Sequence, residues 1–304
     1  MFVSPITGYS NITLVKTIPS ESLIQSWKNI LEIDITNELH QCQEIYLFKC
    51  NETQLKFFAP FEIAGSEKLY EQLQRFDWYY MSKKWEHQVA LKNLHDCKQI
   101  LEVGSAFGSF VELAIKSGLN IKGIELNKAA VRIAQQKNLP VEHLDLQELA
   151  KQAPQSLDAI CSFQVLEHIS QPKDFIEWSI QLLKPNGKLI FCVPNSESFL
   201  QYQDNLLDMP PHHMLRWSTQ SFKALEKIFP VRLEKRIIEP LASYHVSLYL
   251  DSYSSYFRSI SPLYKLLFNR HTTPVYRKLL KTGLRRFLTG QSLYVQFRKV
   301  DKIA

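Results

Sequence analysis

Residues 101–108 read Leu-Glu-Val-Gly-Ser-Ala-Phe-Gly, and this stretch predicts the fold of the chain. An apolar run at 100–103 comes before the small residues, and helix-forming residues follow at 109–116. A strand, a tight turn and a helix N-terminus in this order are typical of an α/β protein whose turn faces a nucleotide-like ligand. Gly104 and Gly108 lack a Cβ, so the backbone can approach such a ligand closely.

The spacing of the small residues argues against a dinucleotide-binding turn. That turn needs the pattern Gly-x-Gly-x-x-Gly, and counting from Gly104 places Ala106 and Ser109 where glycine is required. The pattern that fits is Glu-x-Gly-x-(Gly/Ala)-x-Gly, which begins at Glu102 and ends at Gly108. It resembles motif I of the class I S-adenosylmethionine-dependent methyltransferases. The alternative is a tight strand–helix turn in another kind of α/β protein.

The resemblance implies a binding site for S-adenosylmethionine. Glu102 would lie near the methionine ammonium group, and the glycine turn would pass under the sulfonium and the ribose. Glu125 ends a second apolar strand at 121–125, where it could accept hydrogen bonds from both ribose hydroxyls. Asp145 follows a third short strand and would bind the adenine amino group. The cofactor-binding residues expected on this basis are Glu102, Gly104, Ala106, Gly108, Glu125, Asp145, Leu146, Gln164, Tyr79 and Tyr80.

The order of segments after the turn strengthens the resemblance. A strand that ends in Leu-Glu-His-Ile precedes a helix at 172–183 and then a strand that begins Leu-Lys-Pro-Asn-Gly. Residues 98–195 thereby resemble motifs I to III of small-molecule methyltransferases, with Asn186 in a turn position that glycine usually fills. Strands at 231–238 and 291–299 would end the sheet. The expected fold is a Rossmann-like, doubly wound, seven-stranded sheet with an antiparallel last strand.

The first 96 residues predict a small α+β accessory region, and residues 97–304 the methyltransferase domain. Short strands are expected at 12–15, 44–50 and 55–60, and helices at 66–75 and 82–95 with serine N-caps. The segments Ser-Pro-Ile-Thr-Gly (4–8) and Cys-Asn-Glu-Thr (50–53) resemble a zinc knuckle found in sugar-pathway methyltransferases. Only Cys50 keeps a thiol, and structural zinc takes four nitrogen or sulfur ligands, so we expect no metal here.

Aromatic residues lie just before motif I. In the resembled family such residues often cover the cofactor, which makes Trp78, Tyr79 and Tyr80 candidates for a lid. Packing between the two regions of the chain is the alternative.

Two groups of residues could act on the acceptor. Gln164, Glu167 and His168 follow the fourth strand and resemble the Glu-x-x-Glu-His cluster that holds a divalent metal in ubiquinone-type O-methyltransferases. Because the first position is Gln164, a neutral amide, we expect no metal. His168 could serve as a base, or these polar residues could only pack at the start of a helix.

The second group lies in Pro-Pro-His-His-Met-Leu-Arg-Trp-Ser, residues 210–218. This resembles the acceptor-facing segment of the same methyltransferase group. His212 and His213 have side chains that can take a proton near neutral pH, although adjacent histidines also occur in surface loops. The catalytic candidates are therefore His212, His213 and His168.

Residues 244–289 form a basic insertion before the last strand. Between Ser252 and Val300 the chain has ten Arg or Lys and no Asp or Glu, whereas its overall net charge is +6. We expect aromatic-rich helices beside the acceptor cleft, acting as a lid or docking surface. An anionic acceptor, a membrane surface or nucleic acid would suit this charge. A solvated helical face is the alternative.

Composition agrees with an enzyme. The chain has 304 residues and 45% hydrophobic content, and no run of about 18 apolar residues predicts a membrane span. The five cysteines are scattered, and no signal peptide is evident, so we expect a reducing cytoplasmic setting, with contact at the inner membrane face as an option. We expect methyl transfer to a small-molecule or glycan-linked acceptor, such as a sugar nucleotide or a polysaccharide precursor. Nucleic acid is the less favoured partner, and a non-catalytic cofactor-binding protein is the remaining alternative.

Overall fold

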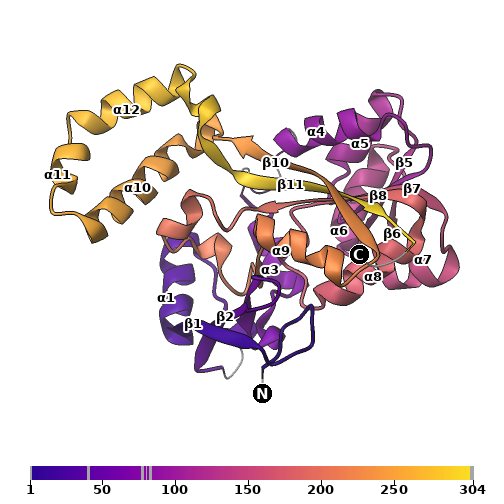
Figure 1. Ribbon diagram of the computed structural model, residues 1–304, viewed down its shortest axis with the longest axis horizontal. Helices are drawn as coiled ribbons and strands as arrows, with labels where there is room; N and C mark the ends of the chain where they lie inside the picture. The colour runs from indigo at the N-terminus through magenta and orange to yellow at the C-terminus, as the bar shows by residue number, and fades with distance from the viewer. Residues whose placement is uncertain (1, 40–41, 77–78, 80, 82–83, 302–304) are drawn as a thin grey trace.

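A seven-stranded sheet forms the centre of the protein (Figure 1). The computed structural model describes residues 2–39, 42–76, 79, 81 and 84–301. The strands of the sheet are β4 (Ile100–Val103), β5 (Ile121–Glu125), β6 (Val141–His143), β7 (Leu157–Phe163), β8 (Leu183–Pro194), β10 (Val231–Pro240) and β11 (Thr289–Lys299). They lie in the order β10-β11-β8-β7-β4-β5-β6, and β11 is antiparallel to both neighbours. The predicted Rossmann-like sheet with an antiparallel last strand is confirmed.

Helices cover both faces of this sheet, as expected for a doubly wound fold. One face packs against α4 (Trp85–Leu94), α5 (Ser109–Lys116) and α6 (Lys128–Gln136). The other packs against α7 (Leu146–Gln152), α8 (Pro172–Leu182) and α9 (Thr219–Ala224). Successive strand residues point to opposite faces, so Ile100 joins the first layer and Leu101 the second.

The N-terminal region builds a second, antiparallel sheet. Its strands are β1 (Ile12–Pro19), β2 (Glu44–Cys50), β3 (Lys56–Ala59) and β9 (Leu215–Arg216), in that order. β9 comes from the segment after the fifth strand of the central sheet, and it pairs with β3. Segment 210–218, which we expected to face the acceptor, is thereby tied to the N-terminal region, and the sequence did not indicate this.

The helices of this region agree with expectation in part. Helix α3 (Glu67–Leu73) has the predicted N-cap, because the Ser66 side chain accepts a hydrogen bond from the Leu69 N–H. The predicted helix at 82–95 begins at Trp85 as α4, and Ser82 lies outside the described residues.

Two helices were not predicted, α1 (Ser20–Leu31) and α2 (Thr36–Leu39). α1 buries Leu23 and Trp27, four residues apart on one face. It follows Pro19 without a side-chain cap, so the usual start signal is missing.

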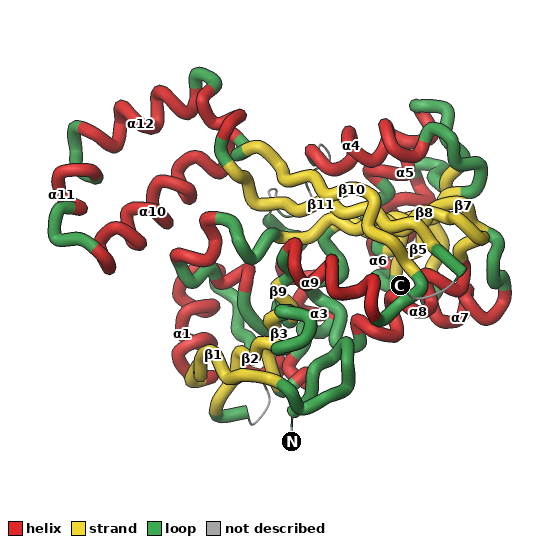
Figure 2. Tube along the Cα trace, in the orientation of Figure 1, coloured by secondary structure: helices red, strands yellow, loops and turns green. Residues whose placement is uncertain are grey.

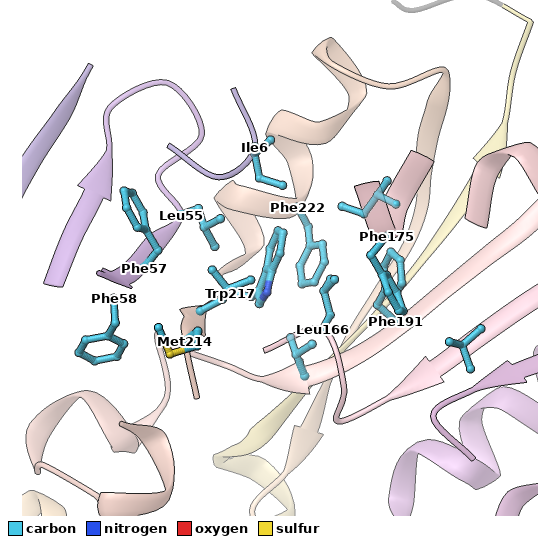
Figure 3. Close-up of a cluster of buried hydrophobic side chains, with 14 of the residues drawn as sticks. Ile6, Leu55, Phe57, Phe58, Leu166, Phe175, Phe191, Met214, Trp217 and Phe222 are labelled. Carbon is cyan, nitrogen blue, oxygen red and sulfur yellow. The ribbon is translucent and has the colours of Figure 1, made fainter. Parts of the chain in front are cut away.

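A continuous hydrophobic core joins the two sheets (Figure 3). Phe57 from the N-terminal sheet and Phe191 from the central sheet belong to one buried cluster. Between them Trp217 stacks on Phe222, with ring centroids 4.7 Å apart. The boundary at residue 96 therefore crosses a shared core, and the division into two domains stays a prediction.

The basic insertion forms an arm that projects from the sheet (Figures 1 and 2). It contains α10 (Val246–Ile260), α11 (Tyr264–Leu267) and α12 (Thr272–Lys281), between β10 and β11. This confirms the predicted helical insertion. A small cluster of Phe199, Leu200, Val246 and Leu250 fixes its base. The arm extends outward from the sheet instead of covering the strand ends as a lid (Figure 1). No helix among the described residues has the length and apolar character needed to cross a bilayer.

Candidate functional site

A cavity of about 870 Å³ opens at the carboxyl ends of the parallel strands. The chain order reverses at β4, since β5 and β6 lie on one side of it and β7 and β8 on the other. Open α/β sheets bind ligands at such a switch point. Ser105, Asn127 and Val165, which follow β4, β5 and β7, all line the cavity. Most of the predicted cofactor residues and the three predicted histidines line this one cavity.

The turn after β4 has the left-handed backbone that its small residues allow. The φ angles are +77° at Gly104, +46° at Ala106 and +74° at Gly108. A Cβ on Gly104 would lie 2.4 Å from a methyl of Val165, so the turn packs directly on the next cavity wall. Gly104 and Ala106 line the cavity, whereas Gly108 does not and instead precedes α5 as its N-cap. Gly108 therefore shapes the turn without facing the ligand space.

Glu102 places a buried carboxylate at the cavity wall. Its side chain is 4% exposed, and its Oε2 atom has no hydrogen-bond partner among the described residues. Burial raises the pKa of this carboxyl well above its usual value, and the Lys84 charge only partly opposes the shift. A buried acid without a partner is costly unless a ligand supplies a cation or donor. This orphaned oxygen fits the ammonium group of a methionine moiety.

Glu125 is held in a fixed orientation by the backbone of the glycine turn. Its Oε2 accepts the Ala106 N–H at 2.9 Å and its Oε1 accepts the Asn127 N–H at 2.9 Å. A carboxylate oxygen has two lone pairs, so each can still accept a second hydrogen bond. Since Glu125 lines the cavity, the pair of oxygens can face two neighbouring hydroxyls.

Residues after β5 and β6 form the next part of the cavity wall. Asp145 caps α7, because its Oδ1 accepts the N–H groups of Gln147 and Glu148. This leaves Oδ2 for a ligand, and both Asp145 and Leu146 line the cavity. Leu126 also lines it and is 61% exposed. Sequence reasoning missed Leu126. Its position directly after the strand-end acid Glu125 could have indicated that it packs against a planar ring of the ligand.

Gln164 contacts a residue that the sequence did not single out. Its Nε2 donates to Glu86 Oε1 at 3.3 Å, and its backbone φ is +56°. Glu86 lies in the first turn of α4 and is 4% exposed. Gln164 lines the cavity, and its side-chain amide donates to Glu86. It can therefore stabilise the cavity wall and also contact a ligand.

Three histidines meet on the opposite side of the cavity. One ring nitrogen from each of His168, His212 and His213 lies within 4.8 Å of the other two. The rings of His212 and His213 stack at 4.4 Å, and His168 meets both edge-on. All three line the cavity, and we name them the histidine cluster. The sequence predicted each one separately, and the fold brings them together.

Hydrogen bonds fix the ring orientations in the histidine cluster. The Nδ1–H of His168 donates to the carbonyl of His212 at 2.5 Å, and the Nδ1–H of His212 donates to the carbonyl of Leu207 at 2.7 Å. His213 directs Nδ1 at Asp208 Oδ1, 3.3 Å away. With Nδ1 as the donor in each neutral ring, Nε2 carries the lone pair that can accept a hydrogen bond.

Burial favours the neutral forms of the three histidines and of Glu167. Burial lowers the pKa of His168 to about 4 and lowers the pKa of His212 and His213 well below the usual range. Burial also raises the pKa of Glu167 to about 8. Both Glu167 oxygens lack a hydrogen-bond partner among the described residues. Oε1 lies 3.9 Å from His168 Nε2 and 4.0 Å from His213 Nε2.

Chemically, this arrangement can do one of two things. Neutral imidazole lone pairs can accept a proton from an acceptor group. Imidazole nitrogens beside a carboxyl group that can ionise when a metal binds are also ligands that zinc and related metals prefer. Asp208 supports either role, because its carboxylate lies next to His213 Nδ1 and pairs with Arg216 at 2.9 Å.

Of the three aromatic lid candidates, Tyr79 is the one that the structure describes. The Tyr79 hydroxyl donates to His212 Nε2 at 2.9 Å, which places Tyr79 beside the histidine cluster. Trp78 and Tyr80 lie outside the described residues. Tyr79 therefore lies on the histidine side of the cavity, and its expected contact with the cofactor stays a prediction.

The knuckle-like segments come together without a set of metal ligands. Ser4, Cys50 and Thr53 are all buried, and the Thr53 N–H donates to Cys50 Sγ at 3.5 Å. Among the described residues, the one group placed to hold a metal is the histidine cluster. Hydrogen bonding and the apolar β1–β3 core hold residues 4–53 in this fold. That this region binds no zinc stays a prediction.

Comparisons with known proteins agree with this geometry. A family model described as "Methyltransferase domain" matches residues 73–229. The ubiquinone biosynthesis O-methyltransferase of Nitrosococcus oceani is 29% identical over 167 residues, covering 48% of this chain and 66% of that protein. The protein of the same name from Coxiella burnetii is 32% identical over 116 residues, covering 36% and 47%. The chain thus spans about half to two thirds of the length of the curated relatives it matches.

Solved structures also resemble the chain at a lower level. A SAM-dependent methyltransferase from Archaeoglobus fulgidus aligns with 77% of this chain and 100% of its own, at 18% identity and a TM-score of 0.46. This value is too low to bear on activity. The family match covers more than half of the chain and agrees with the enzyme class and cofactor that motifs I to III predicted. The chain belongs to the methyltransferase-domain family.

Proposed function

We propose that the protein transfers a methyl group from S-adenosylmethionine to a hydroxyl of a small-molecule acceptor. The observation that carries this proposal is the division of one cavity into two chemically different sides. Carboxylates line the side at the ends of β4, β5 and β6, and neutral histidines line the side formed by residues 164–168 and 205–213. A cationic methyl donor suits the first side, and a group that must lose a proton suits the second.

The residues present fit the methyl donor. Glu102 would hold the ammonium group with its orphaned oxygen, and Glu125 would accept from the two ribose hydroxyls. Asp145 Oδ2 would accept from the adenine amino group, with Leu126 and Leu146 against the ring. When bound, the cofactor supplies an activated methyl on a sulfonium, so positioning of the acceptor accounts for much of the rate.

The histidine cluster would orient the acceptor and take its proton. Burial lowers the pKa of these imidazoles, so they are unprotonated at neutral pH and their Nε2 atoms can accept a hydrogen bond. The Tyr79 hydroxyl already occupies the neighbourhood of His212 Nε2 as a donor. An acceptor hydroxyl could replace Tyr79 in that hydrogen bond. The proton would pass from the acceptor hydroxyl to an imidazole Nε2 of the histidine cluster.

A second role for the same cluster is to hold a divalent metal. The convergence of three imidazoles on one space, with an unpartnered Glu167 carboxyl beside them, favours this role. A bound metal would lower the pKa of an acceptor hydroxyl, so that the histidines would not need to act as bases. Turnover by chelator-treated, metal-free protein supports the base role, and turnover restored only by added metal supports the second.

The acceptor class rests on the relatives and the cavity. The curated relatives are named as O-methyltransferases, which favours an oxygen acceptor of small size. A glycan-linked acceptor, such as a sugar nucleotide, is the finer alternative that the basic insertion suggested. A cofactor-binding protein without turnover is the remaining one.

Methyl transfer from labelled S-adenosylmethionine tests these possibilities. We expect label to move to phenolic or other hydroxyl-bearing small molecules, with S-adenosylhomocysteine as the second product. Preference for a sugar nucleotide over a simple phenol would favour the glycan alternative. Binding of the donor without transfer to any member of both acceptor classes would contradict an enzymatic role.

A further inference from the structure

The arm formed by residues 243–288 exposes an unusual number of large apolar side chains. Leu263 and Leu266 are 60% and 69% exposed around α11, and Phe287 at the foot of α12 is 87% exposed. Further exposed apolar side chains lie along the rest of the arm. The exposed apolar residues of the arm are Tyr244, Ile260, Leu263, Leu266, Leu267, Val275, Leu279, Leu284 and Phe287. Clusters of this kind mark interaction sites in soluble proteins.

Positive charge is interleaved with these apolar residues. On α12 the exposed Val275 and Leu279 share a face with the exposed Lys278 between them. Lys265 lies directly beside Leu266 on α11, and Arg286 beside Phe287. From Ser252 to Val300 the chain has no acidic residue to neutralise them. Lysine and arginine can extend past apolar neighbours to reach headgroup phosphates while their stems stay in apolar surroundings.

The inner side of the arm is already satisfied. Phe268, Tyr276 and Leu280 pack toward the cluster of Phe199 and Leu250 that anchors α10. The outward residues thus make up a second apolar surface that the described part of the fold leaves uncovered. The arm projects away from both sheets, with α11 at its far end (Figure 1). It can therefore touch a flat surface without a clash from the rest of the molecule.

We propose that this arm docks the protein on a membrane surface that carries anionic headgroups. Apolar side chains would enter the headgroup region, and the cations would pair with lipid phosphates, as in interfacial amphipathic helices. The base of the arm lines the catalytic cavity through Tyr244, His245 and Leu248. Docking would bring the cavity close to the lipid surface. This interaction does not depend on the proposed methyl transfer.

Lipid suits the arm better than nucleic acid does. A nucleic-acid surface requires cations with polar or stacking groups to meet phosphates and bases. Here seven of the nine exposed apolar residues of the arm are aliphatic, and aliphatic side chains gain nothing from a phosphate backbone. An anionic lipid surface can bind both the cations and the exposed apolar side chains of the arm.

Co-sedimentation of the full chain with vesicles tests the proposal. We expect binding to phosphatidylglycerol-containing vesicles and little binding to pure phosphatidylcholine. Raising the salt from about 0.1 M to about 1 M should weaken the binding, since the screening length falls to about 3 Å. Changing Lys265, Lys278, Lys281 and Arg286 to Glu should lower the affinity by about a hundredfold or more.

A second variant and a matched control complete the test. Leu266→Ser with Leu279→Ser and Phe287→Ser should also abolish binding, and because these positions are exposed the fold should be kept. Reversal of four exposed cations away from the arm, at Lys98, Arg132, Lys137 and Lys151, should leave most of the binding. Equal loss in this control would overturn the proposal. So would binding to a short RNA that exceeds vesicle binding, or self-association through the apolar positions without vesicle binding.

Discussion

The two sides of the cavity differ in how they are built. On the cofactor side, Glu102 and Glu125 come from consecutive strand ends, and a single glycine turn fixes the second carboxylate. On the acceptor side, His168 comes from the turn after β7, while His212 and His213 come from a loop 44 residues later. That loop is held in place by β9 pairing with the N-terminal sheet. The cofactor side is local in sequence, and the acceptor side is assembled from distant segments.

This difference indicates which residues of the enzyme can be changed without disturbing the central sheet. A donor that is shared across a family needs the same carboxylates at the same strand ends. An acceptor pocket built from a long loop, the N-terminal region and the base of the arm can change without disturbing the sheet. Substitutions on one side should therefore leave the other side's binding intact.

The largest expected effect is on turnover. Changing His213 to Ala should lower turnover by about a hundredfold or more, because a positioned acid–base or metal-ligating group is lost. Changing His212 to Ala should act in the same direction, and His168 to Ala is the next candidate. Single-turnover kinetics with saturating donor would measure this loss.

The matched readout for these variants is donor affinity. It should stay within about twofold, since the histidines lie away from the strand-end carboxylates. If cofactor affinity fell as much as turnover, the two sides would not be independent. If both loop variants kept normal turnover, the acceptor-side role would pass to His168 or to positioning alone.

A smaller effect should come from His87, an imidazole on the cofactor side. His87 is 4% exposed between Phe110 and Phe163, and burial lowers its pKa to about 3. Its folded pKa lies below its unfolded one, so stability from this group is present above pH 6.5 and lost as the pH falls toward 3. His87→Phe should remove this part of the acid sensitivity, by roughly 1.4 kcal/mol per pH unit in that window.

Urea unfolding at a series of pH values would measure the effect. The difference in stability between His87→Phe and the parent chain should grow as the pH falls from 7.5 to about 4.5. A difference that stays constant with pH would show that His87 does not titrate as its burial implies.

The smallest expected effect concerns residues 4–53. Cys50→Ser should not change the metal content, because a single thiol cannot hold structural zinc. Elemental analysis of the parent chain, Cys50→Ser and His213→Ala would locate any metal. Zinc lost with Cys50→Ser would show that residues 4–53 had been misread. Metal lost only with His213→Ala would place it in the histidine cluster.

Much of the central sheet could be predicted from the sequence, because its signals are local. The glycine turn, the apolar strands and the helix at 109–116 follow from short-range patterns, and β4, β5 and α5 have the predicted bounds. The positive φ at Asn186 was also foreseen from its turn. The strand-end carboxylates could be named for the same reason.

What could not be predicted depends on contacts between distant segments. Nothing near Leu215 indicates that it pairs with Phe57, and the α1 helix lacks a side-chain cap. The two histidine segments are also joined over a long sequence distance, because the Glu167 carbonyl accepts the N–H groups of Met214 and Leu215. Separate histidines could therefore be named from the sequence, but not a cluster. Glu86 and Asp208 were missed because their roles are to support Gln164 and His213.

Calorimetric titration of the protein with S-adenosylmethionine tests the central claim most directly. We expect micromolar-range binding of the donor or of S-adenosylhomocysteine and no appreciable binding of NAD. Glu125→Ala should weaken the binding by roughly 1–3 kcal/mol, the cost of hydrogen bonds left unmade at a buried site. Absence of heat with either ligand, or equal affinity in the Glu125→Ala variant, would contradict the assignment of this cavity to the methyl donor.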